Sequence, residues 1–303
     1  MKKRLRLRIS QNGEAMRARQ RWASVWAIGA VAAAYATGAC TRGTANTAVT
    51  AAPPTPAGAL TVQERLTSSP RHGEWAMIRT GPNDSVRAWV VYPERSAKAP
   101  VVVVVHEIYG LSTWVRGVAD QLAANGYIAI APDLLTGKVA LQADTVTQAA
   151  ASAAIRTLRV DDVHRQLEAV AKYGMALPAA VPRYGVVGYC WGGSTSFAHA
   201  VRSPAGLGAA IVYYGSSPDT SELSRVKVPV LGLYGGNDQR VNATVPRTDT
   251  IMRRLGKPYE IHFFTGAGHG FLRQQDGAAG ANLTASEQAW PLTVAFFRRH
   301  LRG

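Results

Sequence analysis

The chain has 303 residues, of which 47% are hydrophobic and 17% charged, so it is long enough to bury a large core in one domain. The formal net charge is +15, but residues 1–21 hold eight Lys or Arg against one acid, Glu14, and so supply +7 of it. The remainder shows no basic run with interleaved aromatic residues, which argues against nucleic-acid binding. No repeat of fixed period is visible, which argues against solenoids and propellers.

Residues 1–39 have the pattern of a secretory signal peptide. The basic segment precedes an apolar stretch of about fifteen residues, Trp22 to Ala36, which is too short for a comfortable transmembrane helix. The small residues Gly38 and Ala39 then offer a cleavage site. Because the basic segment is long for a signal peptide, Met16 is a possible true start.

Cys40 follows directly, as in a bacterial lipobox, although Thr37 stands where a leucine-like residue is usual. Residues 40–60 are rich in Thr, Ala and Pro and predict a flexible linker before a domain over 61–303. We therefore expect an exported protein, either a periplasmic or membrane-anchored lipoprotein acylated at Cys40 or a plain secreted protein. An uncleaved membrane anchor is the third alternative.

From residue 61 apolar strands alternate with helical stretches, which is typical of a mostly parallel sheet with helices on both faces. The continuous run Val101–Val105 is typical of a strand buried on both faces. The turn residues Gly81-Pro82-Asn83-Asp84 predict an antiparallel hairpin at the N-terminal edge. The predicted strands are 74–78, 86–92, 101–106, 127–131, 184–189, 209–214, 228–234 and 259–264, and the predicted helices are 113–125, 160–173, 192–201, 245–255 and 286–301.

In open parallel sheets, active sites form beyond the carboxyl ends of the strands. Reactive side chains that directly follow predicted strands are therefore candidate site residues. They are His106, Glu107, Asp133, Cys190, Asp238 and His269.

The stretch VVGYCWGGS, Val186 to Ser194, has the layout of a nucleophile elbow, in which a strand turns sharply into a helix. Small residues two before and two after Cys190 permit this turn. A helix N-terminus favours a thiolate, and the Trp191 amide would face a developing oxyanion. The alternative is a buried cysteine in an ordinary turn.

Asp238 and His269 each follow a later strand and a Gly-rich turn. The chain order of nucleophile, acid and histidine is that of α/β-hydrolases. His269 would carry the proton of the nucleophile, and Asp238 would orient and stabilise its imidazole. Taken singly, each could instead be a turn cap or a surface residue.

Five motifs together resemble the dienelactone hydrolase family, also called carboxymethylenebutenolidases. The resemblance extends from Val86 to the C-terminus and implies an α/β-hydrolase fold with a cysteine in the elbow. The motifs are HEIYG (His106 to Gly110), APDLL (Ala131 to Leu135), GVVGYCWGG (Gly185 to Gly193), GGND (Gly235 to Asp238) and GAGHGFLR (Gly266 to Arg273).

The resemblance also implies roles for further residues. Glu107 matches a glutamate that pairs with the resting cysteine and helps to generate the thiolate when substrate binds. The Ile108 amide matches the second oxyanion donor, and Arg273 matches an arginine that binds the substrate carboxylate. A second substrate arginine cannot be aligned, because residues 144–160 diverge. Candidates for further substrate contacts are Tyr109, Arg156 and Arg159.

The expected function is hydrolysis of a small ester or lactone, with or without a carboxylate, through a Cys190-His269-Asp238 triad and an acyl-thioester. No cofactor is expected, and no histidine and cysteine cluster suggests a metal. Two alternatives keep the fold: an exported binding protein with little turnover, and an acyltransferase or peptidase that uses the same triad.

Overall fold

The computed structural model describes residues 54–140 and 147–302. Cys40, the predicted signal peptide and most of the predicted linker lie outside these residues, so export and acylation stay predictions. Residues 54–60, expected in the linker, pack against the domain: Pro56 and Gly58 are buried. The Ala59 N–H donates to the Arg273 carbonyl at 2.8 Å. The folded part therefore begins a few residues before 61.

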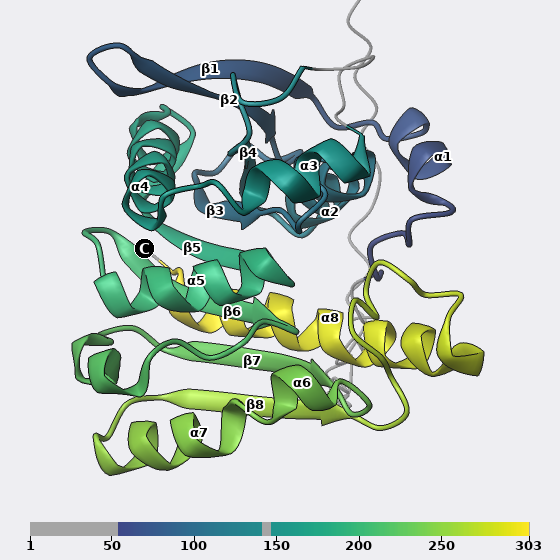
Figure 1. The fold of residues 1–303 in the computed structure, drawn as a ribbon. Coiled ribbons are helices and arrows are strands. Elements are labelled where there is room, and N and C mark those ends of the chain that lie inside the picture. The colour runs from purple at the N-terminus through teal and green to yellow at the C-terminus, as the bar shows by residue number, and fades with distance from the viewer. Residues whose placement is uncertain (1–53, 141–146, 303) are drawn as a thin grey trace, which may run out of the picture. The chain divides into compact units, whose positions relative to one another are not determined.

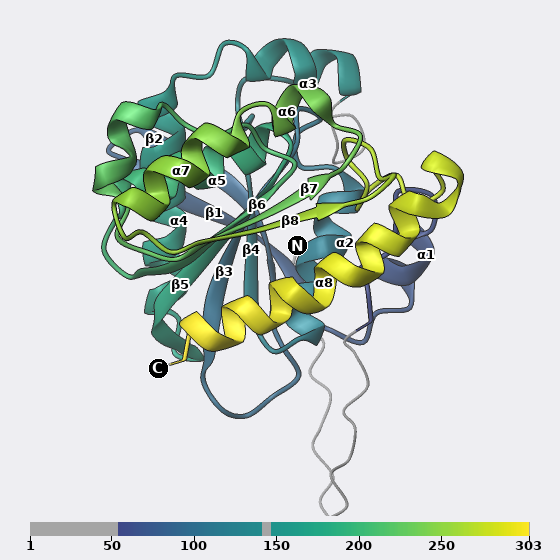
Figure 2. The same cartoon turned by 90° about the horizontal axis from the view of Figure 1, so that it is seen from below.

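Eight strands form one sheet in the order β1-β2-β4-β3-β5-β6-β7-β8 (Figures 1 and 2). Strands β3 to β8 run parallel, whereas β2 pairs antiparallel with both β1 and β4. The predicted sheet with an antiparallel N-terminal hairpin is confirmed. The strands are β1 (Gly73–Gly81), β2 (Asp84–Val91), β3 (Ala99–Val105), β4 (Ile128–Asp133), β5 (Ala180–Tyr189), β6 (Leu207–Tyr213), β7 (Val230–Gly235) and β8 (Tyr259–Phe264).

The predicted helices correspond to α2, α4, α5, α7 and α8, although α8 begins at Ala281 rather than at Ser286. The short helices α1, α3 and α6 were not predicted. The Ala-rich sequence of α3 has no polar stripe, and α1 and α6 span only two turns or less. The helices are α1 (Val62–Thr67), α2 (Thr113–Ala124), α3 (Gln148–Ile155), α4 (Val160–Ala176), α5 (Trp191–Arg202), α6 (Gln239–Asn242), α7 (Val245–Arg254) and α8 (Ala281–His300), with 3₁₀ turns at Thr220–Arg225 and Ala278–Gly280.

Helices cover both faces of the sheet, with α2 and α8 on one face and α4, α5 and α7 on the other (Figure 2). Strand β3 lies between the two resulting cores. Val102 and Val104 pack into the core beneath α2 and α8, whereas Val101, Val103 and Val105 pack into the core beneath α4 and α5. Each of these valines is at most 1% exposed, which explains why this strand is a continuous apolar run.

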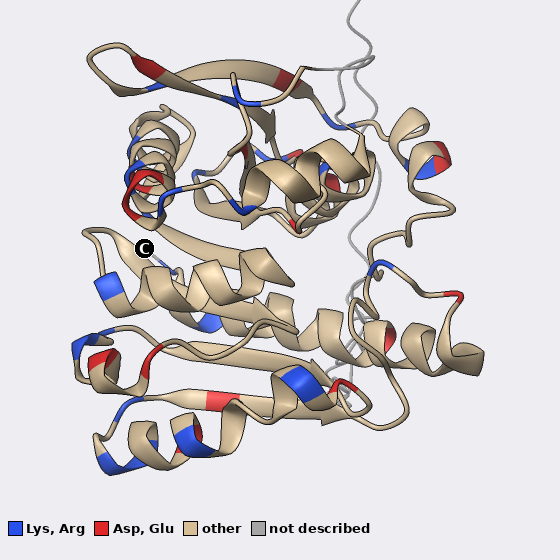
Figure 3. Cartoon of the chain, viewed as in Figure 1, with Lys and Arg blue, Asp and Glu red and all other residues tan. Residues whose placement is uncertain are grey.

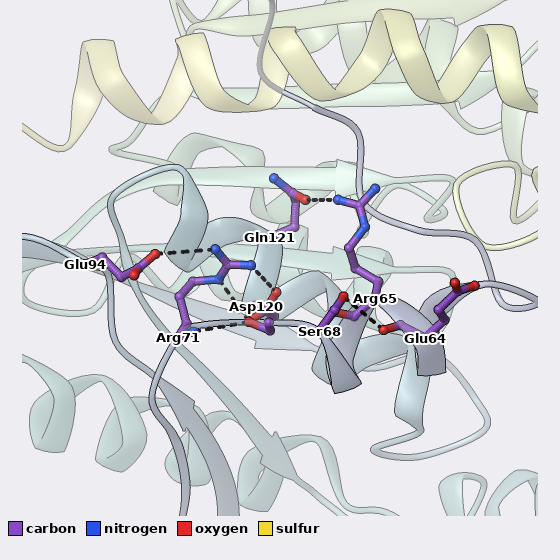
Figure 4. Close-up of polar contacts among 8 residues, drawn as sticks. Glu64, Arg65, Ser68, Arg71, Glu94, Asp120 and Gln121 are labelled. Carbon is purple, nitrogen blue, oxygen red and sulfur yellow. Dashed lines mark hydrogen bonds and ion pairs between the residues drawn. The ribbon is translucent and has the colours of Figure 1, made fainter.

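The segment before β1 is attached to α2 by packing and by charge (Figure 4). Val62 of α1 lies so close to Gly117 that a Cβ there would approach its methyl to 2.2 Å. The buried Asp120 carboxylate accepts two hydrogen bonds from the Arg71 guanidinium, at 2.9 and 2.7 Å, and one from the Ser69 hydroxyl at 2.6 Å. This segment is therefore an integral part of the domain.

The charged residues lie mainly on helices and loops, whereas β3, β6 and β7 contain none (Figure 3). Among residues 54–140 and 147–302, no helix combines the length and the apolar character that crossing a membrane requires.

Candidate active site

The carboxyl ends of the parallel strands bring four candidate residues to one edge of the sheet. Glu107 follows β3, Cys190 follows β5, Asp238 follows β7 and His269 follows β8. Cys190 and His269 line one cavity of about 240 Å³. The cavity is lined by Ile108, Cys190, Trp191, Ser194, Tyr214, Ser216, Arg240 and His269.

Cys190 sits on a strained turn between β5 and α5. Its backbone has φ 55° and ψ −116°, which is sparsely populated for a residue other than glycine, and its N–H donates to the Tyr213 carbonyl at 3.1 Å. A Cβ at Gly188 would lie 1.8 Å from the Gly192 carbonyl oxygen, and one at Gly192 would lie 2.4 Å from that of His106. The glycine spacing read from the sequence is therefore required by the close approach of strand and helix.

His269 is oriented by Asp238. Its Nδ1 lies 2.5 Å from Asp238 Oδ2, and the Asp238 side chain is only 6% exposed. The Tyr214 ring packs edge-on against the imidazole, with 5.2 Å between the ring centroids. Because Nδ1–H donates to the carboxylate, Nε2 of the neutral ring is the nitrogen that can accept a proton.

The Cys190 thiol is protonated in the resting site. The pKa of the Cys190 thiol is raised to about 11, chiefly by burial and then by the nearby Glu107 charge, although the Trp191 amide and Arg240 oppose this rise. This differs from the expectation that the helix N-terminus favours a thiolate, because burial outweighs the favourable groups. The thiol therefore needs a base before it can attack.

Glu107 is paired with Arg273. The Arg273 Nε donates to Glu107 Oε2 at 2.6 Å, and the two side chains are 18% and 4% exposed. Burial raises the pKa of the Glu107 carboxyl, and Arg273 opposes this rise. The resting partner of Glu107 is thus the arginine, whereas the expectation from the family was the cysteine.

Arg273 lies beside Tyr109, with its guanidinium carbon 5.0 Å from the centre of the ring. Both residues line a cavity of about 250 Å³ other than the one that contains Cys190. Trp191 and Ile108, the predicted oxyanion donors, do line the Cys190 cavity. Within the described residues, the Ile108 N–H donates no backbone hydrogen bond.

The other candidates lie elsewhere. Arg156 is exposed at the end of α3 and lines neither cavity, and Arg159 pairs with Asp162 at 3.8 Å. The Nδ1 atom of the buried His106 lies 2.7 Å from the Glu107 carbonyl oxygen, and its Nε2 accepts a hydrogen bond from the Leu134 N–H at 3.3 Å. His106 therefore connects the loop after β3 to the loop after β4.

The cavity that contains Cys190 and His269 is also lined by residues that the sequence did not single out. Arg240, two residues after Asp238, and Tyr214, directly after β6, both line the cavity. Inspecting a few more residues after the predicted strand 228–234 could have found Arg240, whereas Tyr214 lies inside the predicted strand 209–214. Within residues 54–140 and 147–302, no group of three or more His, Cys, Asp or Glu side chains could hold a metal ion.

A cysteine on a strained strand-to-helix turn, with an aspartate and a histidine after later strands of a mostly parallel sheet, defines the α/β-hydrolase class. The dienelactone hydrolase family model matches residues 86–301. The chain therefore belongs to the dienelactone hydrolase family and is a hydrolase.

Individual relatives agree with this assignment. The chain is 30% identical over 260 residues to a provisionally named carboxymethylenebutenolidase of Salmonella typhimurium, covering 81% of this chain and 90% of the relative. It is 29% identical to one of Methylorubrum extorquens, covering 71% and 77%. A provisionally named dienelactone hydrolase from Klebsiella pneumoniae has a similar fold, with a TM-score of 0.67, 24% identity, and coverage of 76% of this chain and 99% of that one.

Proposed function

We propose that this protein hydrolyses a small ester or lactone through a Cys190-His269-Asp238 triad. The observation that carries the proposal is that the imidazole of His269, bound to Asp238, lines the same cavity as Cys190. That cavity, about 240 Å³, is below the range of about 300–1,000 Å³ that holds drug-sized ligands, which favours a small substrate.

In the first half-reaction, His269 Nε2 takes the thiol proton as Cys190 Sγ attacks the scissile carbonyl carbon. The negative charge that develops on the carbonyl oxygen is stabilised by the Trp191 and Ile108 amides. The intermediate collapses to an acyl-thioester when the carbon–oxygen bond breaks, and the imidazolium returns its proton to the leaving alkoxide. A lactone would stay attached through its acyl group.

In the second half-reaction, His269 takes a proton from water, whose oxygen attacks the thioester carbonyl. Collapse releases the carboxylic acid, and the Cys190 sulfur regains its proton from the imidazolium. Asp238 stabilises that imidazolium in both steps. Glu107 helps to deprotonate the Cys190 thiol when a substrate anion draws Arg273 away from it, because an unpaired buried carboxylate is a stronger base.

The test is steady-state hydrolysis of 4-nitrophenyl acetate and dienelactone by the wild type and by Cys190→Ala. We expect the variant to lose at least about a thousandfold in kcat, because the covalent route is gone. Cys40→Ala, which removes the other cysteine, is the control and should keep wild-type turnover. Full turnover by Cys190→Ala would refute the triad, and an inactive wild type would favour a binding protein.

A further inference from the structure

A further cavity lies beside the Cys190 cavity, between α4 and α5, and we call it the α4–α5 cavity. Its volume is about 190 Å³. Both cavities are lined by Trp191 and Ser194, which belong to the first turn of α5. The two spaces therefore meet at the turn that carries the nucleophile.

The walls of the α4–α5 cavity are mainly apolar. The Thr195 hydroxyl, which also lines it, already donates to the Trp191 carbonyl at 3.0 Å. No Lys, Arg, Asp or Glu is among the described residues that line it, whereas Arg240 lines the Cys190 cavity. Its aliphatic side chains are those of Leu158, Val160, Val163 and Ala198.

His164 also lines the α4–α5 cavity and adds no charge at neutral pH. Its Nδ1 lies 3.1 Å from His199 Nδ1, and burial lowers the pKa of His164 to about 4. Val160, on the wall of the same cavity, is 65% exposed. An apolar ligand would therefore remove an exposed valine from water without desolvating a charge.

Packing around Trp191 links the two cavities. Ile108 lines the Cys190 cavity and Leu158 lines the α4–α5 cavity, and both pack with Trp191 against one small hydrophobic cluster. In the proposed mechanism the leaving oxygen must lie at His269, which lines the Cys190 cavity but not the α4–α5 cavity. The acyl group stays on Cys190, so it is the part of the substrate that can extend past the first turn of α5.

We propose that the α4–α5 cavity binds an apolar acyl chain, so that the protein selects esters of medium-length aliphatic acids. This inference rests on the proposed hydrolase function and adds the substrate class. Each methylene group that is fully buried in an apolar site gains about fourfold in binding. A hexanoyl group carries four methylenes more than an acetyl group, and those that leave water set the gain.

The test compares 4-nitrophenyl acetate with 4-nitrophenyl hexanoate, with each kcat/KM divided by the rate constant for hydrolysis of that ester by hydroxide. We expect a corrected hexanoate-to-acetate ratio of about 10 to 100 for the wild type. Ala198→Leu fills part of the cavity and Val160→Asp places a charge on its wall, and each should lower the ratio at least about fivefold. A wild-type ratio near one, or a ratio that neither variant lowers, would overturn the proposal.

Leu283→Asp is the matched control. Leu283 is 43% exposed in the first turn of α8, as Val160 is exposed in the first turn of α4, and it lines neither cavity. This variant should keep the wild-type ratio. A loss as large as that of Val160→Asp would show that the effect does not come from the α4–α5 cavity and would overturn the proposal.

A measurement on the thiol separates this proposal from the proposed function. An alkyl methanethiosulfonate transfers its alkylthio group to the Cys190 thiolate: a disulfide forms and methanesulfinate leaves, so the alkyl chain stands in for an acyl chain. In a Cys40→Ala background, the hexyl reagent should modify Cys190 at least about tenfold faster than the methyl reagent, after correction for their rates with glutathione. Ala198→Leu should reduce this preference.

The two measurements fail independently. Equal corrected rates for the two reagents would overturn the inference even if the wild type is an active hydrolase. A preference for the hexyl reagent in a protein that hydrolyses no ester would support the cavity and refute the hydrolysis alone.

Discussion

The buried Glu107–Arg273 pair should be strongly coupled in stability, and the structure sets the size of the effect. Arg273→Met keeps an unbranched, uncharged stem as far as the position of Nε and leaves a 4% exposed carboxylate without its cation. Removing one partner of a buried ion pair typically destabilises a protein by about 3–5 kcal/mol. We therefore expect the free energy of unfolding to fall by roughly that amount at pH 7.

A double-mutant cycle isolates the pair. Glu107→Gln removes the charge that Arg273 compensates, so Arg273→Met should be less damaging in that background by about 2 kcal/mol or more. Urea unfolding followed by tryptophan fluorescence measures the four free energies. The control is Arg253→Met, which breaks the exposed pair with Asp249 on α7 and should cost less than about 1 kcal/mol.

The pH dependence of Arg273→Met gives a second check. Burial raises the pKa of the folded Glu107 carboxyl above its unfolded value, and the loss of Arg273 removes an opposing influence. The folded state then binds the proton more tightly than the unfolded state, so the penalty is full above the folded pKa and shrinks as pH falls through it. A coupling energy near zero, together with a penalty that does not change with pH, would refute the claim that this pair is buried and mutually dependent.

Two further predictions concern stability and the elbow. Burial lowers the pKa of His164 to about 4 and of His199 to about 3, so both stay neutral in the fold while the unfolded chain takes up protons below about pH 6.5. Each of these two histidines should lower the free energy of unfolding by about 1.4 kcal/mol per pH unit as the pH falls from 6.5 toward 4. Urea unfolding at several pH values measures this slope, and His199→Gln should reduce it. An unchanged slope in the variant would contradict the claim that His199 is buried in its neutral form. Gly188→Ala should lower esterase kcat at least about tenfold and lower thermal stability, because the new Cβ would lie 1.8 Å from the Gly192 carbonyl oxygen; wild-type activity in this variant would show that the turn tolerates a side chain.

Much of this architecture was predictable because it depends on local pattern. The continuous run Val101–Val105 predicts a strand buried on both faces, and the structure places its valines alternately in two cores. The glycines around Cys190 predict a tight strand-to-helix turn, and the chain folds that way. Because parallel strands share one carboxyl edge, the positions of Asp238 and His269 after later strands were enough to predict that they meet.

The tertiary structure alone decided how the charges are arranged around that edge. Glu107 and Arg273 are 166 residues apart, and only the folded loops show that they pair. The same packing buries the Cys190 thiol enough to raise its pKa, against the expectation from the helix N-terminus. It also leaves Arg156 in solvent and places Arg240 in the cavity. The positions of strands and helices follow from hydrophobic periodicity, whereas pKa values and substrate contacts depend on burial and on neighbours distant in the chain, which no local pattern encodes.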